Sequence, residues 1–117
     1  MQKYLKELVE ISGISGKEEK VMLFIKKNIQ DKVDSISVDN VGNLIAFKKG
    51  NDSSKKIMFA AHMDEVGLMV TKIYEDGTLG VAQVGGVDPR VLKAQRLKIN
   101  DEIVAILNST PIHLDHN

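Results

Sequence analysis

The sequence FAAHMDEVG, residues 59–67, holds the side chains whose types and spacing could do chemistry. Small and apolar residues lead directly to His62, and two carboxylates follow at Asp64 and Glu65. A neutral imidazole is a good ligand for zinc or cobalt, and a metal-bound histidine usually donates its other ring N–H to a carboxylate or carbonyl. Residues two apart in an extended chain point to the same side, so His62 could bind a metal while Asp64 holds the ring.

A purely structural interpretation of the same residues stays open. The His-x-Asp spacing occurs often by chance, and a histidine at a strand end can simply bond to a neighbouring carboxylate. A weaker set of ligand-type residues, His113, Asp115 and His116, lies at the chain end, where fraying is common. Ser12 and Ser15 have no histidine near them in sequence, which leaves a serine triad without support.

Two helices are predicted before the strand that would carry these side chains. Residues 1–12 place apolar side chains at helical spacing, with Lys and Glu on the other face. A second helix is predicted over residues 15–29, with Ser15 as its cap and Glu18 at the spacing of a capping box. The side chains expected on its buried face are Val21, Phe24, Ile25 and Ile29.

The hydrophobic period then changes from that of a helix to that of a strand. Alternation predicts strands over residues 35–39 and 43–49, joined by a turn. Residues 57–61 are apolar on both faces, which predicts an internal strand of a covered sheet. His62 then lies at or just beyond the C-terminal end of that strand, where open α/β sheets bind their ligands.

The second half of the chain is predicted to be a small β module. Asp88 and Pro89 suit the cap and first position of a short helical turn. Short strands are expected over residues 67–74, 78–86, 95–99 and 102–107. The change of pattern near residues 64–68 predicts two parts: an α/β part over residues 1–66 and a β-rich part over residues 67–117.

Composition excludes several classes of function. The 117 residues are enough for one compact domain, and 43% are hydrophobic and 27% charged. A formal net charge of zero indicates neither a nucleic-acid binder nor a membrane-surface binder, and no apolar run is long enough to span a bilayer. The lack of cysteine excludes disulfides, thiolate nucleophiles and Cys-based zinc sites, and it suits a cytoplasmic location.

Four stretches of the sequence, in order and at matching intervals, resemble one known family, and together they extend over about residues 5–114. They are SGISGKEEKV, VDNVGNLIAFKKG, IMFAAHMDEVGLMV and VGGVDPRVLKAQRLKI. They are similar to the N-terminal part of the glutamyl-aminopeptidase, or tetrahedral aminopeptidase, family of dinuclear metallopeptidases. The resemblance implies an α/β catalytic sandwich, interrupted shortly after the His-x-Asp strand by a β-barrel, PDZ-like dimerisation domain.

The resemblance also implies roles for two residues. His62 matches the family's first metal-ligand histidine, and Asp64 matches the catalytic-site aspartate that orients its ring. The complete enzyme would hold two divalent ions, zinc or cobalt, act on peptides with a free N-terminus and form a homo-oligomer. The bridging aspartate, the general-base glutamate and the remaining ligands come later in the family, so we expect an incomplete metal site and no activity from these 117 residues alone.

Two other functions compete with this interpretation. The chain could instead be a non-catalytic interaction or oligomerisation module derived from the family, with its β-rich half pairing with another subunit. Relatives have also been labelled endoglucanases, but the chain has no Trp and only 4% aromatic residues, which makes a sugar-stacking platform hard to build. No pair of carboxylates can be placed across a glycosidic bond.

Overall fold

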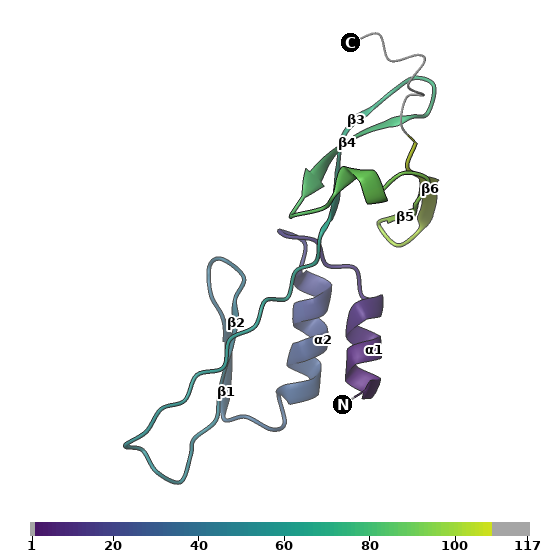
Figure 1. Ribbon diagram of the computed structural model, residues 1–117. Coiled ribbons are helices and arrows are strands. Elements are labelled where there is room, and N and C mark those ends of the chain that lie inside the picture. The colour runs from purple at the N-terminus through teal and green to yellow at the C-terminus, as the bar shows by residue number, and fades with distance from the viewer. Residues whose placement is uncertain (1, 109–117) are drawn as a thin grey trace. The chain divides into compact units, whose positions relative to one another are not determined.

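A computed structural model describes residues 2–108 of the chain (Figure 1). The chain divides into two compact units, Met1–Glu65 and Val66–Asn117. Among the described residues, none of the helices combines the length and the apolar character needed to cross a membrane. The expected cluster at His113, Asp115 and His116 lies outside the described residues.

The first unit begins with two helices, α1 (Gln2–Glu10) and α2 (Glu19–Ile29). The predicted inner face of α2 is correct, because Val21 is buried at 6% exposure while Phe24, Ile25 and Ile29 are half-buried. Val21 is the one buried apolar side chain among the described residues. Along α1, by contrast, much of the predicted apolar stripe is exposed, so this helix buries little of the surface that its sequence provides.

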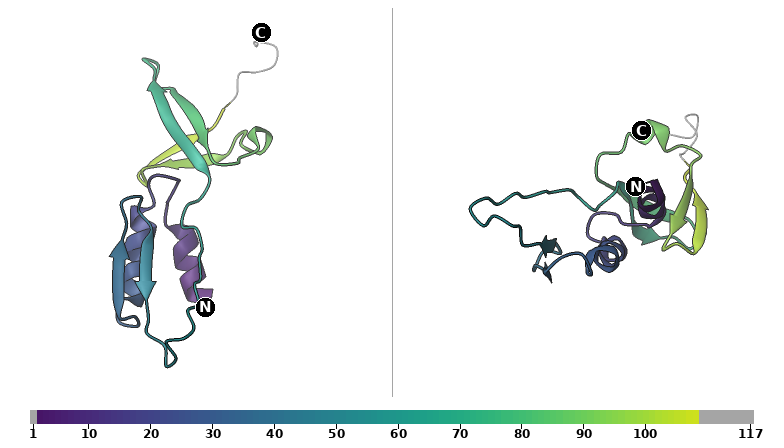
Figure 2. Two further views of the ribbon diagram at one scale, coloured as in Figure 1. Left: turned by 90° about the vertical axis from the view of Figure 1, so that its left-hand side faces the viewer. Right: turned by 90° about the horizontal axis from the view of Figure 1, so that it is seen from below.

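A hairpin follows the helices and lies beside α2 (Figures 1 and 2). Strands β1 (Ser35–Val38) and β2 (Leu44–Phe47) pair antiparallel, as the alternating pattern predicts. The turn between them includes Gly42 at a φ of 92°, a conformation that glycine adopts without steric cost.

The predicted internal strand over residues 57–61 is wrong for this chain. These residues form no strand, and no described residue pairs with them in a sheet. Met58 and Phe59 are 87% and 93% exposed, so neither apolar face is covered. Strand propensity mainly reflects packing on neighbours, and a segment without a partner strand gains neither ladder hydrogen bonds nor buried area.

Up to residue 108, the second unit contains two hairpins and a short helical turn, as its sequence predicts. Strand β3 (Gly67–Ile73) pairs with β4 (Leu79–Val84), and the register shifts between Val70 and Lys72. A 3₁₀ turn, η1 (Pro89–Val91), precedes the hairpin of β5 (Arg96–Ile99) and β6 (Ile103–Ile106).

Local side chains and backbone geometry explain the turns of this unit. Asp88 caps η1, since its carboxylate accepts a hydrogen bond of 2.9 Å from the backbone N–H of Arg90. Asn100 and Asp101 take φ values of 51° and 66° between β5 and β6. Two consecutive residues with positive φ are the mark of a type I′ hairpin turn, and Asn and Asp tolerate that conformation better than most residues do.

Candidate metal site

The imidazole of His62 lies against Asp64. Its Nδ1 atom is 3.1 Å from Oδ1 of Asp64 and 3.0 Å from the backbone carbonyl oxygen of Asp64. Both partners are acceptors, so Nδ1 carries the proton and donates it, which leaves the lone pair on Nε2. The His62 side chain is 86% exposed. The arrangement therefore leaves Nε2 of His62 accessible to a ligand.

The second oxygen of Asp64 contacts Ser15. The hydroxyl of Ser15 donates a short hydrogen bond to Oδ2 of Asp64, across 49 positions of sequence. This bond is the main reason why the pKa of Asp64 lies below its ordinary value, and the interaction with His62 adds to the effect. Asp64 is therefore held as a carboxylate between a serine and a histidine.

Ser15, Asp64 and His62 form a hydrogen-bonded trio. The backbone next to Asp64 is hydrogen-bonded to the loop between α1 and α2. The N–H of Glu65 donates to the carbonyl oxygen of Gly13 at 2.8 Å, and Oε1 of Glu65 accepts from the N–H of Gly13 at 3.0 Å. Ile14 and Glu65 form a parallel bridge. Gly13 is buried against α2, where an added Cβ would lie 2.6 Å from Cγ2 of Val21. A residue with a Cβ would fit there only if the side chain of Val21 or the loop shifted.

The order of the contacts excludes a nucleophilic serine in this geometry. In a serine triad the histidine lies between the hydroxyl and the carboxylate and removes the hydroxyl proton. Here the carboxylate of Asp64 lies in the middle and accepts from both Ser15 and His62. The trio is therefore suited to orienting the imidazole.

Among the described residues, the His62–Asp64 pair can supply one metal ligand, the imidazole of His62. Residues 2–108 contain no group of three or more His, Cys, Asp or Glu side chains placed to hold a metal ion. His62 with a free Nε2 and a carboxylate on Nδ1 has the chemistry of a single zinc or cobalt ligand with its orienting partner. Further ligands have to come from outside the described residues.

Sequence patterns found two of the three residues in this trio. His62 and Asp64 are two positions apart, and the structure brings them together. Ser15 was expected to cap the second helix, and that prediction is wrong. The position before α2 is Glu18, which makes no side-chain cap hydrogen bond, and the hydroxyl of Ser15 is bonded to Asp64 instead. No local pattern marks a contact between residues so far apart in sequence.

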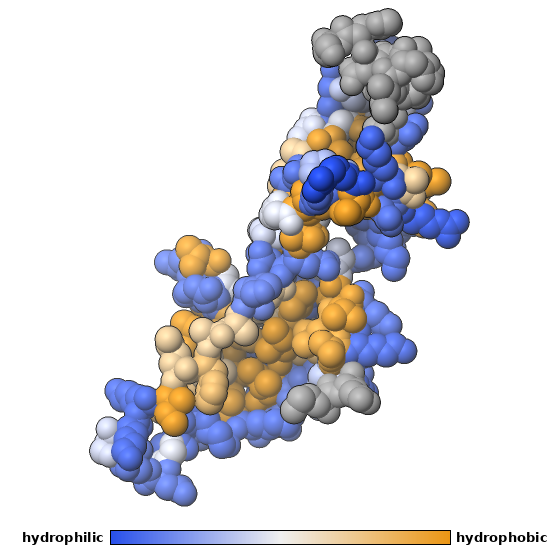
Figure 3. Space-filling model, viewed as in Figure 1, coloured by the Kyte–Doolittle hydropathy of each residue, from blue (hydrophilic) through white to orange (hydrophobic). Residues whose placement is uncertain are grey.

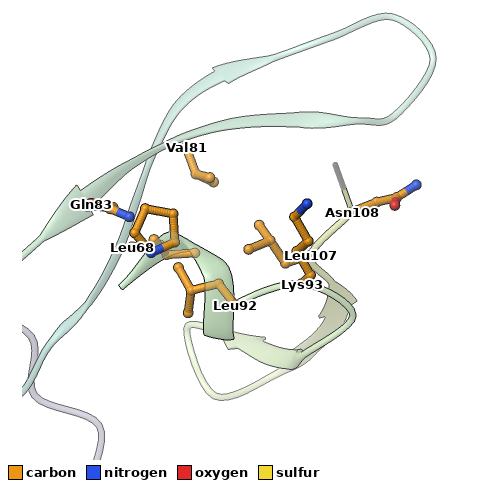
Figure 4. Close-up of a pocket in the computed structure, with 8 residues that line it drawn as sticks. Leu68, Val81, Gln83, Leu92, Lys93, Leu107 and Asn108 are labelled. Carbon is orange, nitrogen blue, oxygen red and sulfur yellow. The ribbon is translucent and has the colours of Figure 1, made fainter. Parts of the chain in front are cut away.

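The second unit has a pocket of a different character (Figure 4). It measures about 270 Å³, and among the described residues that line it Lys93 is the ionisable one. The other lining residues are Leu68, Val81, Gln83, Pro89, Leu92, Leu107 and Asn108. Among the described residues, this lining is mostly apolar.

Solved structures show the same fold. An endoglucanase of Thermotoga maritima superposes with a TM-score of 0.86 at 47% identity, over 92% of this chain and 34% of that one. The TET1 peptidase of Pyrococcus horikoshii superposes with a TM-score of 0.77 at 36% identity, over 97% of this chain and 34% of that one. The helices and hairpins of the described residues thus share the fold of these solved structures.

The chain belongs to the M42 glutamyl aminopeptidase family, whose model matches residues 42–117. A lysyl aminopeptidase of Pyrococcus furiosus is 38% identical over 114 residues, which are 94% of this chain and 32% of the relative. The chain therefore spans about a third of the length of the relatives that it matches. The matched range includes His62 and Asp64.

Proposed function

We propose that this chain is the N-terminal part of a metal-dependent aminopeptidase that removes N-terminal residues from peptides. The observation that carries the proposal is the His62–Asp64 contact, which leaves Nε2 of His62 free within the part of the chain that the family model matches. Relatives named lysyl aminopeptidase and glutamyl aminopeptidase support this class of reaction.

In the complete enzyme, this chain's residues would do two things. His62 would offer the lone pair of Nε2 to one of two divalent ions, zinc or cobalt. Asp64 would hold the proton on Nδ1, fix the tautomer and make the imidazole a stronger donor. When bound, the metal pair supplies Lewis acidity for the peptide carbonyl and for the attacking water. The 117 residues alone would be inactive, because one histidine does not make a catalytic metal site.

We assign the two parts of the chain different roles. Residues 1–66 would belong to the catalytic α/β domain, and residues 67–117 to a β-barrel, PDZ-like insertion used in oligomerisation. The TET1 peptidase of P. horikoshii assembles into a tetrahedron or a large octahedral shell, which supports a homo-oligomer as the working form. A cytoplasmic location stays a prediction from the sequence.

The two competing functions are distinguished by family and chemistry. The T. maritima relative carries the name endoglucanase, yet the family model and the lysyl and glutamyl aminopeptidases among the relatives favour peptides as substrates. A non-catalytic module would retain the fold and need no metal. A measurement of metal content therefore separates it from the aminopeptidase.

The test replaces His62 by Ala in the complete enzyme. We expect the variant to lose one of its metal ions and nearly all aminopeptidase activity, while Asp64→Asn costs about 10–100-fold in metal affinity or rate through lost orientation of the ring. Metal content by mass spectrometry of the purified protein and hydrolysis of aminoacyl substrates measure both effects.

The other two histidines of the sequence provide matched controls. His113→Ala and His116→Ala remove the same side chain, and we expect both to retain wild-type metal content. Full metal content and turnover in His62→Ala would contradict the assignment. Loss of metal in His113→Ala or His116→Ala, with His62→Ala unaffected, would instead favour the cluster at the chain end.

A further inference from the structure

We propose that Ser15 is a positioning residue for the metal-ligand histidine, acting through Asp64. The inference rests on the proposed function for the metal, but its geometry is independent of it. The hydroxyl of Ser15 donates to Oδ2 of Asp64, and Oδ1 of the same carboxylate accepts from Nδ1 of His62. One carboxylate thus links the loop before α2 to the imidazole.

Little else holds the imidazole in place. The His62 side chain is 86% exposed, so packing does not fix its ring. Among the described residues, the hydrogen bonds of its ring are both with Asp64, through the carboxylate and through the backbone carbonyl. The last torsion of an aspartate side chain has a broad energy well. A carboxylate held at one oxygen only would therefore restrain the imidazole less, with the backbone carbonyl of Asp64 as the remaining partner of Nδ1.

Ser15 is well placed to restrict that torsion, because its own loop is anchored. Gly13 and Glu65 exchange two hydrogen bonds, which ties the start of the loop to the residue after Asp64. At the other end, the N–H of Gly16 donates to Oε1 of Glu18 at 2.7 Å. The serine hydroxyl and the carboxylate thus sit on two backbone segments already bonded to each other.

The hydroxyl also has no competing role in the helix that follows. A serine at the cap position of a helix accepts from a free N–H of the first helical turn, but Ser15 lies three positions before the cap residue of α2. The residue before α2 is Glu18, without a side-chain cap bond, and the bond that Ser15 makes is to Asp64. The serine therefore serves the candidate metal site and not the helix end.

The test is a set of variants in the complete enzyme, read first by metal affinity in competition with a chromogenic chelator. We expect Ser15→Ala to weaken the binding of one of the two ions about 10-fold, within the range found for outer-shell partners of metal ligands. Ser15→Thr keeps the hydroxyl and should restore most of the affinity. Ser12→Ala removes an exposed serine from the same loop and should leave the affinity unchanged.

Two further measurements separate positioning from a general structural effect. The visible absorption spectrum of the cobalt-loaded enzyme reports ligand geometry and should change in Ser15→Ala but not in Ser12→Ala. Because Ser15 acts through Asp64, the double variant Ser15→Ala/Asp64→Asn should be no weaker in metal binding than Asp64→Asn alone. Should Ser15→Ala fail to fold, Ser15→Cys keeps a similar volume with a much weaker donor and takes its place.

Each negative result has a distinct meaning. Wild-type affinity and spectrum in Ser15→Ala, with metal lost in His62→Ala, would overturn the role of Ser15 and leave the proposed function standing. Additive losses in the double variant, or equal losses in Ser15→Ala and Ser15→Thr, would also overturn it. Full metal content in His62→Ala would overturn the proposed function itself, and with it the link from Ser15 to a metal.

Discussion

At the scale of single residues, aspartates organise the loops of this chain. Four of them accept a hydrogen bond from the backbone N–H two positions later: Asp39, Asp52, Asp76 and Asp88. Each of these bonds favours the charged form, and each of the four carboxyls has a pKa below its ordinary value. Such local turns form without help from the rest of the fold, because both partners are close in sequence.

The turn at Asp39 should loosen in acid. Its carboxylate accepts from the side chain of Asn43 at 2.7 Å, and from the backbone N–H groups of Asn43 at 2.8 Å and Val41 at 3.1 Å. These bonds lower its pKa, the side chain of Asn43 most of all. The stabilisation is therefore complete above the unfolded-state value of about 3.9 and is lost as pH falls through the lower folded value.

An acid titration followed by NMR checks this prediction. We expect the amide resonances of Val41 and Asn43 to shift with a midpoint below that of an unfolded aspartate. In Asp39→Asn, which keeps an acceptor oxygen and cannot ionise in this range, that transition should be absent. A midpoint at or above the ordinary value, or an unchanged transition in the variant, would show that the carboxylate does not hold the turn.

At the scale of elements, residues 57–61 show that a sequence with the pattern of a strand need not form one. Their apolar side chains alternate across two faces, but both faces are exposed and no described strand pairs with them. The β3–β4 hairpin, with a less continuous apolar pattern, is paired because its partner follows within a short turn. Proximity of a partner, rather than propensity, decides which segment is a strand here.

Hydrogen exchange should show this difference directly. In the 117-residue chain we expect the amides of residues 57–61 to exchange rapidly, while the paired amides of β3 and β4 are protected by their ladder. In the complete enzyme the same five amides should become protected, because further strands would then be available. Slow exchange of residues 57–61 in the isolated chain, or fast exchange in the complete enzyme, would contradict the interpretation.

At the scale of the whole molecule, the chain leaves much apolar surface in contact with water. Among the described residues one apolar side chain is buried, while large ones such as Leu5, Val9, Ile57 and Ile106 are more than half exposed. On the face seen in Figure 3, apolar surface gathers over the helical part of the first unit. Monomeric proteins rarely expose large continuous apolar patches.

We therefore expect the isolated 117-residue chain to self-associate or to be marginally stable. Burial of exposed apolar area is the main driving force for association, at about 25 cal/mol per Å². Light scattering should detect species larger than a monomer, and calorimetry should give a broad transition of low enthalpy. The complete enzyme serves as the control and should melt cooperatively. A monodisperse monomer of the isolated chain with a sharp transition would refute the expectation.

The sequence by itself determined what depends on neighbours within a few positions. The inner face of α2 follows from periodicity, and the cap at Asp88 follows from a side chain that bonds to nearby backbone. The turns at Gly42 and Asn100 follow from residue types that tolerate a positive φ. The His62–Asp64 contact belongs to the same group, because residues two apart in an extended segment share a side.

Only the tertiary structure decided where Ser15 bonds and whether residues 57–61 form a strand. Both depend on partners that local sequence does not specify. The Ser15–Asp64 bond joins residues 49 positions apart, and it takes a hydroxyl that the local pattern assigned to a helix end. A strand needs a second strand that hydrogen-bonds to its backbone and a packed layer of side chains that covers its apolar face. The residues of the strand itself specify neither of these partners.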